Sequence, residues 1–183
     1  MNRQATVNLK ESIVAVKLTL NGRVQGIGLR PAVARRALEQ GLTGQISNSI
    51  QGVELIIEGP VDVVRRFEEG LDEHLPAGAW IQNRQREDVE ISALIGFEII
   101  ESDLGGPLAT HVPPDIAVCQ ECLSEISVPE NRRYGYPMTS CTNCGPRYSI
   151  IKSMPYERAQ TGMSEFVMCA RCQTEYRSPA DRR

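Results

Sequence analysis

The chain has 183 residues and a net charge of -3 at neutral pH; 41% of its residues are hydrophobic and 23% are charged. This length suggests one or two globular domains. The charge gives no overall field toward nucleic acid, and no apolar run is long enough to cross a membrane. The first residues, Met1 to Thr6, lack the apolar core of a signal peptide, so we expect a cytoplasmic protein.

A strand, a glycine-containing loop and a helix are the first elements that the sequence predicts. Apolar residues alternate from Ile13 to Leu20, as in a half-buried strand. Glycines at 22, 26 and 28 let the loop curl with its peptide N–H groups inward, and Pro31 is favoured at the first position of a helix. Such a loop at a helix N-terminus can bind an anion, and Arg30 could hold two phosphate oxygens. Many similar loops bind nothing, so a purely structural turn stays open.

The rest of the first region alternates between strands and helices. The helix after the loop should end near Gly41, because Val33, Ala34, Ala37 and Leu38 repeat with helical spacing before it. Strands are predicted over 42–48 and 53–57, a helix from Gly59-Pro60 to about Leu71, and further strands over 80–91 and 95–99. This order is typical of an α+β, ferredoxin-like fold with two helices on one face of an antiparallel sheet. We assign residues 1–101 to this domain and 102–112 to a linker.

Three segments of this domain carry a resemblance: 22–30 around the loop, Gly44-Gln45-Ile46-Ser47-Asn48, and Gly52-Val53-Glu54. Over residues 13–100 they resemble the acylphosphatase family, which implies a βαββαβ sandwich that hydrolyses acyl phosphates. The resemblance also implies that Arg30 binds the phosphate and that Asn48 positions the attacking water. The implied phosphate-binding loop is Val24, Gln25, Gly26, Ile27, Gly28, Leu29 and Arg30. Leu29 replaces a usual aromatic residue and Gln51 a common acidic one, which could alter loop shape and rate.

The chemistry of an acyl phosphate requires little of the protein. The substrate is a reactive mixed anhydride, so catalysis needs mainly a positioned water and stabilised charge on the phosphoryl oxygens. No nucleophilic side chain is required, and we expect His74 to lie on the surface. The alternative for Asn48 is an ordinary strand residue with a solvated side chain.

All six cysteines lie between residues 119 and 172, in three Cys-x-x-Cys pairs: Cys119/Cys122, Cys141/Cys144 and Cys169/Cys172. Eighteen residues separate the first two pairs, a spacing that fits a tetrahedral zinc site with four cysteine ligands. In a reducing compartment metal ligands are favoured over the alternatives, a disulfide or a redox pair. We therefore predict a four-cysteine zinc finger over residues 113–150.

The third cysteine pair belongs to an internal repeat. Six residues recur at an offset of 50 from Cys119 onward: Cys119, Cys122, Glu125, Pro129, Arg132 and Arg133 match Cys169, Cys172, Glu175, Pro179, Arg182 and Arg183. The equivalents of Cys141 and Cys144 would then lie beyond residue 183. The sequence predicts a truncated chain with an incomplete second finger over 151–183, in which Cys169 and Cys172 are half of a second zinc site.

Further motifs extend the resemblance to nearly the whole chain. Pro113-Pro114-Asp115, Cys144-Gly145-Pro146-Arg147-Tyr148 and Pro155-Tyr156, behind an acylphosphatase-like domain, resemble the hydrogenase-maturation carbamoyltransferase family, HypF. The resemblance implies that the front domain hydrolyses carbamoyl phosphate. It also implies that later domains, absent here, use ATP to form carbamoyl adenylate and pass the carbamoyl group to an acceptor maturation protein for [NiFe] hydrogenase.

Two other functions stay open on the residues alone. The chain could be a zinc-ribbon nucleic-acid-binding protein with a non-catalytic front domain, because the second region carries eight arginines. These are interspersed with acidic residues, so a solvated surface explains them more simply. In a third interpretation, the zinc modules are structural spacers behind a degenerate binding domain.

Overall fold

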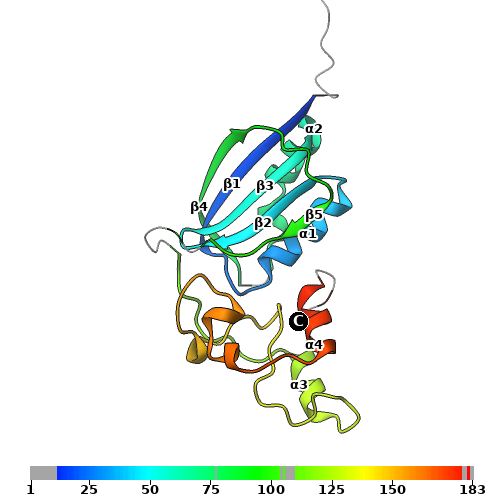
Figure 1. Ribbon diagram of the computed structural model, residues 1–183, viewed down its shortest axis with the longest axis vertical. Helices are drawn as coiled ribbons and strands as arrows, with labels where there is room; N and C mark the ends of the chain where they lie inside the picture. The colour runs from blue at the N-terminus through cyan, green and yellow to red at the C-terminus, as the bar shows by residue number, and fades with distance from the viewer. Residues whose placement is uncertain (1–11, 77, 104, 106–109, 179–180, 182–183) are drawn as a thin grey trace, which may run out of the picture.

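The computed structural model describes residues 12–76, 78–103, 105, 110–178 and 181. Its first region is a five-stranded sheet with two helices on one face (Figure 1). The strands are β1 (Ile13–Arg23), β2 (Thr43–Ser49), β3 (Gly52–Pro60), β4 (Trp80–Val89) and β5 (Phe97–Ile99), in the spatial order β4-β1-β3-β2-β5. The helices are α1 (Leu29–Glu39) and α2 (Val61–Glu69), followed by a short 3-10 helix, η2 (Asp72–His74). The predicted ferredoxin-like plan is confirmed.

The core lies between the sheet and the helices because each element presents one apolar face. On β1 and β3, Leu18, Leu20, Leu55 and Ile57 are completely buried, and Phe67 of α2 packs with them. The other face of these strands carries polar as well as apolar side chains, and Lys17 pairs there with Glu54 at 2.7 Å. Burial of one such apolar side chain contributes about 1.5–3 kcal/mol, so the alternating pattern decides which face packs.

The sheet is mixed, which corrects the prediction of an antiparallel one. The pairs β1–β3, β1–β4 and β2–β3 are antiparallel, but β2 and β5 are parallel, with Gly44 opposite Phe97. The connection after β4 crosses the end of the sheet at which β4 finishes, so β5 starts there and runs alongside β2 (Figure 1). Glu58 holds this crossing in place, because its buried carboxylate accepts hydrogen bonds from the N–H groups of Ser92 and Leu94.

Helix α1 begins two residues earlier than the sequence predicts. Leu29 is its first residue and Pro31 its third, after Gly28 in the left-handed conformation with φ of 76°. The N–H groups of a first helical turn have no partner within the helix, so proline costs no hydrogen bond there. His74 is exposed, as expected.

The second region has little regular structure. It contains α3 (Gln120–Ser127) and α4 (Ala170–Arg177), with short 3-10 helices η3 (Tyr148–Ile150), η4 (Arg158–Gln160) and η5 (Gly162–Glu165). Helices α3 and α4 begin directly after Cys119 and Cys169, whose ψ angles are 161° and 162°. The structure thus reproduces the 50-residue repeat. This region lies against the end of the sheet that carries the loop before α1 (Figure 1).

Within the residues that the structure describes, no helix has the length and apolar character needed to span a membrane.

Candidate functional site

The loop between β1 and α1 is anchored to the first domain by its apolar side chains. Val24, Ile27 and Leu29 are each 1% exposed and belong to the core of the first domain. Gly26 and Gly28 have φ angles of 73° and 76°, in the left-handed region that favours glycine. In this part of the predicted phosphate loop, the peptide groups are therefore the groups suited to contact an anion.

Gln25 is a buried cross-link that the sequence analysis missed. Its Nε2 donates to the carbonyls of Ser49 and Gly52, both at 2.7 Å, and its Oε1 accepts from the N–H of Tyr156 at 2.7 Å. Gln25 thus ties the loop to the β2–β3 turn and to a segment that follows the finger. The predicted loop includes this residue, but its contact partner is 131 residues away along the chain.

Asn48 lies near the end of β2, where its side chain is completely buried rather than solvated. Its Nδ2 donates to the carbonyl of Tyr156 at 2.8 Å. Its Oδ1 is buried without a hydrogen-bond partner among the described residues. Leaving a buried acceptor unpaired costs about 1–3 kcal/mol, so such an atom in a native fold calls for an explanation, such as a binding role.

Arg30, the second residue of α1, forms an ion pair with Glu157. The two side chains are 19% and 20% exposed, and the hydroxyl of Ser102 donates to the same carboxylate oxygen of Glu157. Arg30 and Asn48 thus contact consecutive residues, Glu157 and Tyr156. The structure brings the two predicted catalytic side chains to one place, and their roles stay a prediction.

The second region packs directly on the loop. A Cβ atom at Gly26 would lie 2.9 Å from both Pro146 and Tyr156, and one at Gly28 would lie 2.7 Å from Thr142. Any larger residue at these positions would displace the finger or the loop. The candidate site is therefore bounded by the first domain on one side and by the finger and its following segment on the other.

Two surface hollows lie on or beside the first domain. One, of about 350 Å³, is lined by residues of η2 and β4, including Asp72, Trp80 and Arg84. The other, of about 230 Å³, is lined by residues such as Gln45, Glu54 and Ser102. Neither includes Arg30 or Asn48, so the candidate site is defined by its donor and acceptor groups rather than by these hollows.

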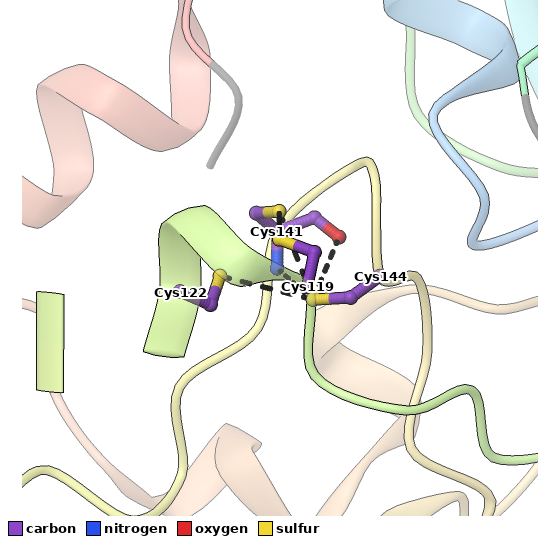
Figure 2. Close-up of side chains that lie close together, drawn as sticks. All are labelled: Cys119, Cys122, Cys141 and Cys144. Atoms are coloured by element: carbon purple, nitrogen blue, oxygen red, sulfur yellow. Dashed lines mark hydrogen bonds between the residues drawn. The ribbon is translucent and has the colours of Figure 1, made fainter. Parts of the chain in front are cut away.

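The four cysteines of the first finger form a compact cluster (Figure 2). Their sulfur atoms all lie within 4.8 Å of one another; Cys119–Cys141 and Cys141–Cys144 are 3.7 Å apart and Cys122–Cys144 are 3.8 Å apart. A tetrahedral zinc with Zn–S bonds of about 2.3 Å requires S···S edges of about 3.8 Å. The cluster therefore has the dimensions of a tetrahedral metal site.

The electrostatic surroundings of the cluster favour a thiolate. A hydrogen bond with the Cys141 thiol lowers the pKa of Cys144 to about 4, while burial acts in the opposite direction. The Arg147 guanidinium, 3.5 Å from the Cys144 sulfur, also lowers this pKa. The pKa of Cys141 is raised, because its hydrogen bond with Cys144 favours the protonated thiol. Metal binding requires deprotonated thiols, so Arg147 supports the cluster as a cationic neighbour.

Cys169 and Cys172 stand apart from this cluster. Cys169 is exposed, and Cys172 lies 3.5 Å from a guanidinium nitrogen of Arg132. Arg132 and Arg133 both form ion pairs with Glu175 of α4. Within the described part of the chain, only the first four cysteines form a group of three or more ligands suited to a metal. The predicted half-site thus has two thiols and no described third ligand.

Comparison with known proteins identifies relatives of both regions. Residues 16–99 match the family model for acylphosphatase and residues 118–151 match the HypF finger. The carbamoyltransferase HypF of Rhodobacter capsulatus is 41% identical over 175 residues, which are 92% of this chain and 22% of that protein. The acylphosphatase of Vibrio parahaemolyticus is 34% identical over 85 residues, which are 46% of this chain and 93% of that protein.

A solved structure agrees with these relatives. The crystal structure of full-length HypF in the phosphate- and nucleotide-bound form superposes with a TM-score of 0.85 and 39% identity, over 94% of this chain and 23% of that one. The chain spans about a fifth of the length of the HypF proteins it matches. The acylphosphatase and HypF resemblances seen in the sequence are confirmed. The chain belongs to the HypF carbamoyltransferase family, of which it contains the acylphosphatase domain and the finger that follows it.

Proposed function

We propose that the first domain hydrolyses acyl phosphates at the loop of residues 24–30, with Arg30 and Asn48 as its catalytic side chains. The observation that carries the proposal is that Arg30 from α1 and Asn48 from β2 reach the adjacent residues Glu157 and Tyr156 beside this loop. A phosphoryl group would be held by the loop N–H groups and the guanidinium fork of Arg30. The family membership of residues 16–99 supports the same reaction.

Asn48 would orient the attacking water. Its Nδ2 is already bonded to Tyr156, and its Oδ1 is free to accept a hydrogen bond from that water. The water oxygen would then attack phosphorus, the bond from phosphorus to the acyl oxygen would break, and the acyl group would leave as a carboxylate. The phosphate would keep the water oxygen with one of its protons, and the other proton would pass to solvent. Arg30 would stabilise the charge on the phosphoryl oxygens. Because the leaving group is a good one, positioning supplies most of what the reaction needs.

Carbamoyl phosphate is the substrate that we favour, because the relatives that match both regions are named carbamoyltransferases. Its hydrolysis would yield phosphate and carbamate. In the whole enzyme the carbamate would enter ATP-dependent transfer to an acceptor maturation protein, outside the region represented here. We assign zinc to the four-cysteine cluster from its dimensions and its finger family, and a reducing cytoplasm as the compartment that keeps these thiols available.

The nucleic-acid alternative is not favoured. Several arginines of the second region are committed to contacts within the protein: Arg133 pairs with Glu125 and Glu175, and Arg147 donates to the carbonyls of Ile116 and Cys144. Together with the net charge of -3, this leaves little basic surface for a phosphate backbone.

Phosphate release from carbamoyl phosphate and from acetyl phosphate tests the proposal. Arg30→Ala should lower kcat/KM by about 100-fold or more, as expected for a donor to developing charge, and Asn48→Ala should lower it by about 10- to 100-fold. Arg65→Ala and Asn83→Ala, at exposed positions on α2 and β4, are the matched controls. Unchanged rates in both Arg30→Ala and Asn48→Ala would show that the site is wrongly assigned.

A further inference from the structure

We propose that Glu157, held by the main chain of Tyr156, completes the acyl-phosphate site as a positioning residue that acts through Arg30. The proposal rests on the function proposed above. It gives residues 155–157, which lie between Cys144 and Cys169, a part in the reaction of the first domain, although they lie outside that domain's sequence.

The carboxylate of Glu157 is held by two side chains. Glu157 accepts a hydrogen bond from Nη1 of Arg30, at 2.5 Å, while a guanidinium has five N–H donors. The Ser102 hydroxyl holds the same carboxylate oxygen, also at 2.5 Å, so Glu157 is held by a group other than Arg30. A carboxylate fixed in this way braces the guanidinium and leaves its other N–H groups for a phosphate.

The main chain of Tyr156 determines where Glu157 lies. Both main-chain polar groups of Tyr156 are bonded to the first domain: its N–H donates to Gln25 Oε1 and its carbonyl accepts from Asn48 Nδ2. These bonds seat the next residue, Glu157, beside Arg30. The bond to Asn48 also fixes which end of that amide faces Tyr156 and leaves Oδ1 as the available acceptor.

The ion pair between Arg30 and Glu157 is largely shielded from solvent. Both side chains of the ion pair are about four-fifths buried, so their attraction is screened less than that of an exposed pair. An arginine side chain is long and flexible. If it is ordered before the substrate binds, less conformational entropy is lost on binding. A carboxylate that instead occupied the place of the phosphate would compete with the substrate. The two roles predict opposite effects when Glu157 is removed.

Steady-state kinetics of the present chain with carbamoyl phosphate and acetyl phosphate separate these roles. Glu157→Ala should lower kcat/KM by about 10-fold for both substrates, mostly as a higher KM, because a mobile Arg30 binds phosphate less well. Glu157→Asp should recover part of this loss and Ser102→Ala should cause a smaller loss. Glu165→Ala is the matched control, since Glu165 is an exposed carboxylate in the same segment that pairs with Lys152.

Dependence on Arg30 is tested separately. Glu157→Ala should cause no further loss of kcat/KM in the Arg30→Ala background, because Glu157 then has no guanidinium to position. Added guanidinium ion should restore part of the activity of Arg30→Ala, and this rescue should disappear in Arg30→Ala/Glu157→Ala. Circular dichroism melting confirms that each variant compared is folded.

Three results would overturn the inference. A lower KM or faster turnover in Glu157→Ala would identify Glu157 as a competitor of phosphate. Unchanged kinetics would mean that the contact has no role in the reaction, and additive losses in the double variant would mean that Glu157 does not act through Arg30. An inactive wild-type chain, or activity insensitive to Arg30→Ala and Asn48→Ala, would instead refute the proposed function itself.

Discussion

The two regions of this molecule hold their folds by different means. The first has a continuous apolar core drawn from β1, β2, β3, α1 and α2, with side chains such as Leu18, Leu55 and Phe67 fully buried. In the second, the tight cluster is Cys122, Cys141 and Cys144, with Cys119 and Val118 packed against it. The first region is stabilised by removing hydrocarbon from water, and we expect the second to depend on bonds from its cysteine sulfurs to a metal. We therefore expect the two regions to unfold independently.

The largest effect should follow loss of the metal. Cys144→Ser, or a strong chelator, should unfold the finger, because metal binding contributes about 10–16 kcal/mol in modules of this kind. Amide NMR signals of residues 110–178 should collapse while those of residues 13–100 persist, and metal analysis should fall from near one zinc per chain to none. Cys169→Ser, at an exposed thiol outside the cluster, is the control. Simultaneous collapse of both regions would show that the first domain depends on the finger.

The reciprocal change is a cavity in the first core. Phe67→Ala should destabilise the first domain by about 3–5 kcal/mol in urea unfolding, through lost burial and an unfilled space, and should leave the metal content unchanged. Leu38→Ala, at a half-exposed position on α1, should cost far less. Metal loss in Phe67→Ala would contradict the separation of the two regions.

Substitutions in the loop test where the regions meet. Gly28 and Gly41 have similar φ angles, 76° and 71°, but a Cβ at Gly28 would meet Thr142 at 2.7 Å whereas one at Gly41 would meet nothing within 4 Å. Gly41→Ala should therefore cost only the backbone term, about 1–2 kcal/mol. Gly28→Ala should cost more in the same urea unfolding measurement and should also reduce acyl phosphate hydrolysis. Equal losses of unfolding free energy in the two variants would mean that Thr142 moves aside at little energetic cost.

The smallest effect should come from removing the ion pairs that join the two copies of the repeat. Glu175→Ala removes the ion pairs of Arg132 and Arg133 with α4, and partly exposed pairs of this kind contribute about 0–1 kcal/mol. Hydrogen exchange of the α4 amides should accelerate by a few-fold, with no change in metal content. Unfolding of α3 as well would show that these pairs support the whole finger.

The sequence predicted what local pattern determines. Alternating apolar residues located β1 and β3, and helical spacing located α1 and α2, because each pattern presents one face to the core. The structure brings the first four cysteines together, as the two Cys-x-x-Cys turns predict, and their role as metal ligands stays a prediction. The parallel pairing of β5 and the burial of Glu58 were not predicted, since both depend on how the chain crosses the sheet.

The candidate site was predicted only in part. Arg30 and Asn48 follow from the loop and strand motifs, but their partners Glu157 and Tyr156 are 127 and 108 residues away along the chain. Contacts between residues so far apart leave no periodic pattern in the local sequence. The motif Pro155-Tyr156 marked the segment without indicating what it touches.

The bond from Asn48 to Tyr156 has an evolutionary consequence. Its acceptor is a peptide carbonyl, which all twenty amino acids provide, and the side chain at position 156 can change without removing it. Relatives could therefore preserve this contact while their residue identities drift. A comparison of aligned columns would overlook it, and only the course of the backbone records that the two halves of the molecule meet there.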